Sequence, residues 1–92
     1  MENADEPVPL PADGMLDLHT FRPQDVKDVV TEYLAACRVR GILRVRLVHG
    51  KGIGNLRRTV QAVLASHPAV VEYHLAGAQS GGWGATIVHL RP

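Results

Sequence analysis

The sequence predicts a two-layer α/β sandwich in the order β-α-β-α-β-β, with a four-stranded mixed sheet and two helices on one face. Two segments carry apolar residues at helical spacing, and four short segments have the alternation or the Val, Ile and Leu content of strands. The chain of 92 residues has room for one domain. Two helices for four strands in so short a chain predict that both helices pack on the same face.

Residues 1–13 are expected to be a flexible acidic, proline-rich tail, and residues 14–92 the folded domain. The tail holds three prolines and four acidic residues with little apolar bulk, so it cannot bury a core. It lacks the basic-then-apolar pattern of a signal peptide, and no apolar run approaches the ~20 residues that span a bilayer. One cysteine, Cys37, excludes an internal disulfide and a cysteine-rich zinc site. We therefore expect a cytoplasmic protein without a membrane partner, and a monomer.

The first strand and the first helix follow the tail. Over residues 15–19 two leucines alternate with Asp17 and His19, which predicts a short strand with these two polar side chains on one face. Residues 23–40 are predicted to form a helix, with Pro23 at its first position and Gly41 as its C-cap. Its apolar stripe repeats at positions i, i+3, i+4, i+7, i+8 and i+11: Val26, Val29, Val30, Tyr33, Leu34 and Cys37.

The second half of the chain supplies three strands and one helix. Residues 43–49 alternate again and predict a strand, and helical spacing resumes at Leu56 and ends before Pro68. Residues 70–75 and 85–90 read as two further strands. The first three strands are joined by helical crossovers, so they should run parallel with right-handed connections. The last two, linked by a loop of about nine residues, should form an antiparallel pair.

Charge is distributed unevenly along the chain. Residues 1–32 sum to −6, whereas residues 33–92 sum to +7, with Glu72 as the only acidic residue of the second part. A segment this basic favours an anionic partner, most commonly nucleic acid. The alternative is that the acidic part neutralises the basic part within the molecule, and charge by itself does not decide between the two.

Polar side chains gather at the predicted carboxyl ends of the first two strands, where α/β sheets bind ligands. If these strands are neighbours, Asp17, His19, His49 and Lys51 converge. One imidazole or carboxylate could then take a proton, a second imidazole could give one, and Lys51 could neutralise the charge of a phosphorane. Alternatively, Asp17 caps a helix or pairs with an arginine, and both histidines bond backbone. We expect no metal site, because the possible ligands lack the tight spacing of known motifs.

A glycine-rich segment at the start of the second helix predicts an anion site. Glycines let several backbone N–H groups approach a phosphate, and the helix N-terminus adds positive potential. Two arginines stand in the first turn, where the helix dipole disfavours cations unless an anion binds there. Trp83 could stack on a base or cover the edge of the sheet. The candidate nucleic-acid-binding residues are Gly50, Gly52, Gly54, Asn55, Arg57, Arg58 and Trp83.

Three motifs, in this order and at these intervals, resemble the small MutS-related (Smr) domain family. They are Leu16-Asp17-Leu18-His19, His49-Gly50-Lys51-Gly52 and Gly81-Gly82-Trp83-Gly84-Ala85-Thr86, and the resemblance covers about residues 15–90. It implies a β-α-β-α-β-β sandwich similar to the C-terminal domain of translation initiation factor three. It also implies nucleic-acid binding and, in many members, endonuclease activity, either DNA nicking in recombination control and repair or messenger RNA cleavage at collided ribosomes. The implicated positions are Asp17, His19, His49, Gly50 and Lys51.

The resemblance leaves three function classes open, and the chain departs from the family pattern at Thr20. An endonuclease would cleave DNA or RNA by hydrolysis or transesterification, with no tightly bound cofactor, although Mg²⁺ or Mn²⁺ could assist. A non-catalytic DNA- or RNA-binding module is the alternative, and an adaptor for an acidic protein is a weaker third. A protein partner could supply targeting. Thr20 stands where the family usually has glycine, and a β-branched residue would reshape that turn if the turn requires a positive φ.

Overall fold

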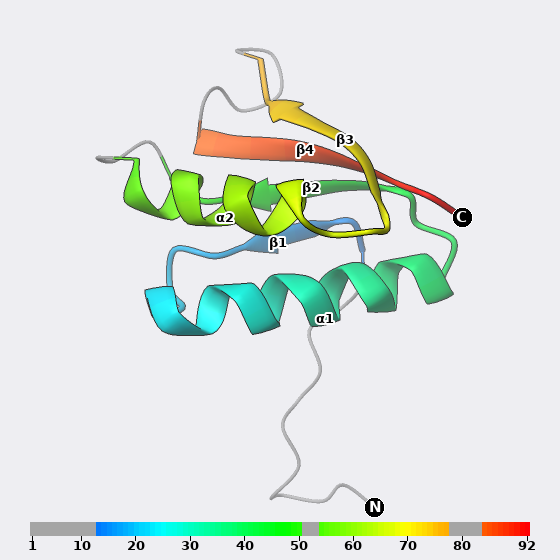
Figure 1. The fold of residues 1–92 in the computed structure, drawn as a ribbon, viewed down its shortest axis with the longest axis horizontal. Helices are drawn as coiled ribbons and strands as arrows, with labels where there is room; N and C mark the ends of the chain where they lie inside the picture. The colour runs from blue at the N-terminus through cyan, green and yellow to red at the C-terminus, as the bar shows by residue number, and fades with distance from the viewer. Residues whose placement is uncertain (1–12, 51–53, 78–83) are drawn as a thin grey trace, which may run out of the picture.

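The computed structural model describes residues 13–50, 54–77 and 84–92 and shows the expected four-stranded mixed sheet with two α-helices (Figure 1). No helix in these ranges is long and apolar enough to cross a membrane. The elements are β1 (Met15–Asp17), α1 (Val26–Val39), β2 (Arg44–Val48), α2 (Asn55–Ala65), β3 (Val70–Leu75) and β4 (Ala85–Leu90), with a 3₁₀ turn η1 (Pro23–Asp25) before α1.

The sheet has the strand order β1-β2-β4-β3. β1 pairs with β2 in parallel, and β4 runs antiparallel to both β2 and β3. The first three strands therefore share one direction, as the sequence predicts, and β3 and β4 form the predicted antiparallel pair. However, β4 lies between β2 and β3, so only β1 and β2 are parallel neighbours. This neighbourhood is what the site requires, because it places the carboxyl ends of β1 and β2 side by side.

One face of the sheet and both helices share a single apolar core. Leu16 of β1 is opposite Leu47 of β2, and Val45 of β2 is opposite Val88 of β4, so these side chains point to the same face. They form one buried cluster with residues of α1 and α2, which confirms that both helices cover the same face. The helical members of this cluster are Val26, Val30, Tyr33, Leu34, Cys37, Val60 and Leu64.

Helix α1 follows the predicted apolar stripe but starts differently. Its first turn, from Pro23, is a 3₁₀ turn, which is common at the N-termini of helices. Gly41 follows the helix with φ of +76°, the left-handed conformation in which glycine ends a helix without steric cost. Cys37 is fully buried on the stripe and has no disulfide partner among the described residues.

The hydroxyl of Tyr33 fastens the start of β1 to α1. It accepts a hydrogen bond from the Gly14 N–H, and it lies 2.9 Å from the Met15 carbonyl and 3.0 Å from a carboxylate oxygen of Asp13. Burial and the neighbouring carboxylate raise the pKa of Tyr33 to about 12. The Met15 N–H and then the Tyr33 hydroxyl lower the pKa of the Asp13 carboxyl. Asp13, the last residue of the predicted tail, thus holds β1 in place.

Candidate functional site

The carboxyl ends of β1 and β2 and the N-terminus of α2 surround a cavity of about 380 Å³. It brings together both histidines of the first two motifs and part of the glycine-rich segment, which are far apart in the sequence. β1 and β2 are held in register at this end by a 2.7 Å hydrogen bond from the Leu18 N–H to the Val48 carbonyl. The cavity is lined by His19, Phe21, Pro23, His49, Gly50, Gly54, Asn55, Leu56, Arg57 and Thr59.

Asp17 and His19 form a carboxylate–imidazole pair at the end of β1. Asp17 Oδ1 lies 2.5 Å from His19 Nδ1 and also accepts the backbone N–H of His19 at 3.0 Å. These two hydrogen bonds lower the pKa of the Asp17 carboxyl, so it remains ionised at neutral pH. A carboxylate only accepts hydrogen bonds, so Nδ1 carries the proton, and Nε2 of the neutral ring keeps its lone pair. Asp17 neither caps a helix nor pairs with an arginine within the described ranges.

The turn after β1 presents this pair to solvent. The Phe21 N–H donates to the Leu18 carbonyl at 3.1 Å, which closes a four-residue turn containing His19 and Thr20. No described residue other than glycine has a positive φ, so Thr20 sits in the turn without the conformation that would strain a β-branched side chain. The side chains of His19 and Asp17 remain 63% and 47% exposed. The first motif is thus formed with Thr20 in place of glycine.

His49 is placed very differently from His19. It is only 4% exposed, and its Nδ1 lies 3.0 Å from the Gly50 carbonyl and its Nε2 2.9 Å from the hydroxyl of Thr86. The carbonyl can only accept, so Nδ1 is the protonated nitrogen, and Nε2 of the neutral ring accepts from the Thr86 hydroxyl. The Gly84 carbonyl also accepts the backbone N–H groups of His49 and Gly50. The third motif thus binds the second through hydrogen bonds of the Gly84 backbone and of the Thr86 side chain.

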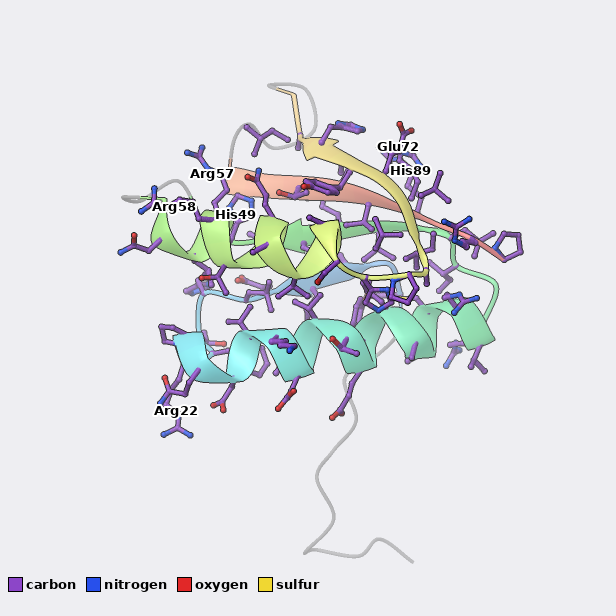
Figure 2. All side chains as sticks on the ribbon, in the orientation of Figure 1. Arg22, His49, Arg57, Arg58, Glu72 and His89 are labelled. Carbon is purple, nitrogen blue, oxygen red and sulfur yellow. The ribbon has the colours of Figure 1, made fainter. Side chains whose placement is uncertain are left out.

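The N-terminus of α2 carries positive charge without a compensating acid. The first backbone N–H groups of a helix have no partner within the helix, and here no acidic residue stands in the first turn and no side-chain hydrogen bond caps it. A Cβ built on Gly54 would lie 3.4 Å from a guanidinium nitrogen of Arg57 and 3.4 Å from one of Arg58. Arg58 donates to the side-chain oxygen of Asn55, and no described residue forms an ion pair with either arginine. Figure 2 shows both arginines at the end of the molecule that holds His49.

Most of the predicted site residues meet at this cavity. Asp17 lies behind His19, to which it is bonded, and Arg58 lies beside the cavity against Asn55. Lys51, Gly52 and Trp83 fall outside the described residues, so their predicted roles stay predictions. The described ranges contain no group of three or more histidine, cysteine, aspartate or glutamate side chains arranged to hold a metal. The predicted residues that line the cavity are His19, His49, Gly50, Gly54, Asn55 and Arg57.

Sequence reasoning missed two features of the site. Thr86 appears in the third motif, but no role was assigned to it because its partner, His49, is 37 positions away in the sequence. The apolar wall formed by Phe21, Pro23 and Leu56 was also missed. A signal existed for Thr86, since a lone threonine at a buried position of an apolar strand needs a hydrogen-bond partner. Phe21 and Pro23 carried no such signal, because turn residues show no periodicity.

The fold and the site define a small α/β sandwich with a histidine-lined, cationic cavity at the carboxyl edge of two parallel strands. The Smr domain family matches residues 16–91, so the chain belongs to the Smr domain family. It is 39% identical over 75 residues to the protein called endonuclease MutS2 of Thermomicrobium roseum and 41% identical over 76 residues to that of Geobacillus kaustophilus. These stretches cover 82% and 83% of this chain but 10% of each relative.

Two solved structures share the fold. The Smr domain of Thermus thermophilus MutS2 superposes with a TM-score of 0.80 at 33% identity, covering 85% of this chain and 98% of that domain. YdaL, a stand-alone small MutS-related protein from Escherichia coli, gives a TM-score of 0.78 at 27% identity, covering 89% of this chain and 67% of YdaL. The fold class predicted from periodicity is thereby confirmed, and so is the family to which the three motifs pointed.

Proposed function

We propose that this chain is an endonuclease that breaks phosphodiester bonds in DNA or RNA. The observation that carries the proposal is the Asp17–His19 pair opening onto a cavity that also receives Arg57 and the uncapped N-terminus of α2. A proton acceptor and an anion-binding surface are the two things that attack on a phosphodiester requires. The name endonuclease, carried by the MutS2 relatives, supports the same activity.

We propose His19 as the general base. Asp17 holds the proton on Nδ1, so Nε2 can take a proton from the attacking oxygen, which is a water or the 2′-hydroxyl of RNA. As the new phosphorus–oxygen bond forms, the bond to the leaving oxygen breaks, and that oxygen takes up a proton from solvent water, while His19 returns its proton to solvent. Arg57 and the N–H groups at the start of α2 stabilise the negative charge that gathers on the phosphoryl oxygens. Lys51 is proposed to add a further positive charge.

A non-catalytic nucleic-acid-binding module is the second candidate, and one observation favours it. Both ring nitrogens of His49 are hydrogen-bonded inside the protein, so this residue can give a proton to a leaving group only after one of these bonds breaks. A positioning role for His49 is therefore the simpler interpretation. In the binding module, Arg57 and Arg58 would hold phosphates and no bond in the substrate would break.

The test is a time course of purified protein with supercoiled plasmid and with labelled single-stranded RNA, each with Mg²⁺, with Mn²⁺ and with EDTA. His19→Ala is the decisive variant, because this side chain is exposed and bonds only Asp17 among described residues, so its removal should spare the fold. We expect at least a hundredfold loss of cleavage, the lower end of what a general base contributes. Binding should change by less than tenfold.

His74→Ala is the matched control, since His74 is an exposed histidine on the opposite side of β3 from the core-packing Tyr73. It should cleave like the wild type. Equal activity in His19→Ala and His74→Ala would reject His19 as the general base, and absence of product from the wild type would leave the binding module. The EDTA arms decide whether a divalent metal takes part, and the two substrates decide which polymer is cut. The polymer that is cut then indicates which role to test next: cleavage of DNA would favour DNA repair, and cleavage of RNA would favour ribosome rescue. A protein partner could direct the chain to either substrate.

A further inference from the structure

One wall of the cavity is apolar, although the other walls are built for an anion. Phe21, Pro23 and Leu56 line it, and they come from the turn after β1, from η1 and from the first turn of α2. Phe21 and Leu56 also pack against the main core, so they are held in place rather than free to move. The Phe21 backbone is further fixed by its hydrogen bond to Leu18. The wall is therefore preformed.

A sugar-phosphate backbone alone gives no use for such a wall. Phosphates and hydroxyls lose hydration against apolar side chains without gaining a hydrogen bond, which disfavours binding. A nucleobase has an apolar face that stacks on aromatic and aliphatic side chains, and polar edges that can form hydrogen bonds elsewhere. The cavity of about 380 Å³ is at the small end of ligand pockets, which suits one nucleotide rather than a length of polymer.

We propose that the cavity takes one unpaired nucleotide, with its base against Phe21, Pro23 and Leu56 and its phosphate toward Arg57 and the N-terminus of α2. The inference rests on the proposed function for its setting, because it names the substrate class of the same site. In an intact duplex both faces of every base are covered by stacking, so the nucleotide must first leave the stack. Single-stranded or locally unpaired segments are therefore the preferred substrates, whichever sugar they contain.

Binding of small probes tests the proposal without any cleavage. Adenosine 5′-monophosphate and ribose 5-phosphate carry the same phosphate, and only the first has a base. Each is titrated into ¹⁵N-labelled wild-type protein while the amide signals of Phe21, Leu56 and Thr59 are followed by NMR. We expect these signals to shift with the nucleotide and its dissociation constant to be at least tenfold lower than that of ribose 5-phosphate, about 1.4 kcal/mol.

A pair of variants on α2 tests the location. Thr59 lines the cavity and Ala62 is exposed outside it, so Thr59→Phe should fill the cavity and Ala62→Phe should not. Nucleotide affinity should fall at least tenfold in the first variant and stay unchanged in the second. Equal affinity for the two probes would overturn the proposal, and so would shifts confined to other residues or no shift at millimolar nucleotide. If Thr59→Phe does not fold, the comparison of probes on the wild type still decides.

The outcomes separate this inference from the proposed function. Nucleotide binding in the cavity by a protein that cleaves nothing would keep the substrate class and reject the chemistry. The converse result needs labelled oligonucleotides in which one position at a time is replaced by an abasic sugar that keeps its phosphate. Cleavage that is indifferent to every replacement, and equal on duplex and single strand, would keep the endonuclease and reject the base-binding wall.

Discussion

His49 shows how a residue of the second motif depends on one residue of the third. The Thr86 hydroxyl is fully buried and lies 2.9 Å from Nε2 of His49, and the Gly50 carbonyl holds the other ring nitrogen. Every polar atom of this imidazole thus has a partner, as buried polar groups require. We interpret His49 and Thr86 as positioning residues that hold the end of β2 at the wall of the cavity, and we propose His19 as the residue that faces substrate.

Thr86→Val should destabilise the protein by about 1–3 kcal/mol, because valine keeps the volume but leaves Nε2 of His49 buried without a hydrogen-bond donor. Thr86→Ser keeps the hydroxyl and should recover part of this loss. Urea unfolding of the three proteins measures the difference in free energy. Long-range ¹⁵N NMR of the wild type should show neutral His49 protonated on Nδ1, and a proton on Nε2 instead would contradict the assignment.

The residue scale also shows how far the candidate site could be predicted. The predicted strand over residues 15–19 is shorter in the structure: Asp17 is the last residue of β1, and His19 lies in the turn that follows. The prediction that His19 and His49 share a site required only that β1 and β2 be neighbours. The different environments of the two histidines could not be predicted. Exposure of His19 and burial of His49 depend on how the turn after β1 and strand β4 close around them, and alternation within one strand contains no such information.

At the scale of elements, helix α2 begins in an unusual way. Gly54 precedes it with φ of +89°, and the two guanidinium groups of the first turn fold back toward that glycine. No described acid balances them. Such an arrangement disfavours the isolated helix, because cations oppose the dipole at this end. The same charges would stabilise the bound phosphate that we propose for this site, which gives a reason for a local sequence that disfavours the isolated helix.

Gly54→Ala should lower the free energy of unfolding by about 1–2 kcal/mol, because an L-residue in the left-handed region is strained even though a Cβ at this position meets its neighbours only at 3.4 Å. Gly77→Ala is the matched control, since Gly77 has no positive φ and its Cβ would meet nothing within 4 Å. Chemical denaturation of both variants decides the matter. Equal stability would mean that the backbone at Gly54 accepts a side chain without cost.

At the scale of the whole molecule, charge is separated along the chain. The part from residue 33 carries +7, and two of its cations stand in the first turn of α2, where Arg57 lines the cavity and Arg58 lies beside it. Nucleic acid releases condensed counterions when cations neutralise its phosphates, so affinity for it depends steeply on salt. If only the net charge of the protein mattered, the loss of any two arginines would lower the affinity for nucleic acid by the same amount. A protein with a localised site would respond mainly to the two at that site.

Replacing Arg57 and Arg58 by glutamine should therefore weaken single-strand binding and reduce the slope of log affinity against log salt by about 1.4, which corresponds to two phosphate contacts. The control replaces Arg40 and Arg44, which lie near the other end of β2, by glutamine. This replacement removes the same amount of charge. Fluorescence anisotropy at several salt concentrations gives both slopes. An equal effect of the two double variants would argue for a diffuse field, and no binding by the wild type would favour the adaptor.

The sequence by itself determined the elements, their order and the family. Burial of one face makes apolar residues recur at a fixed spacing along each helix and strand, and this spacing can be read within a short segment. The sequence therefore located α1 to within one helical turn, and it located both C-terminal strands to the residue. The tertiary structure decided that β4 lies between β2 and β3. Strands pair through backbone N–H and C=O groups, which nearly every residue has, so the side chains of a strand do not specify which strand becomes its neighbour. The tertiary structure also decided that Phe21, Pro23 and Leu56 form one wall and that Thr86 reaches His49, because such contacts depend on how distant segments pack in space.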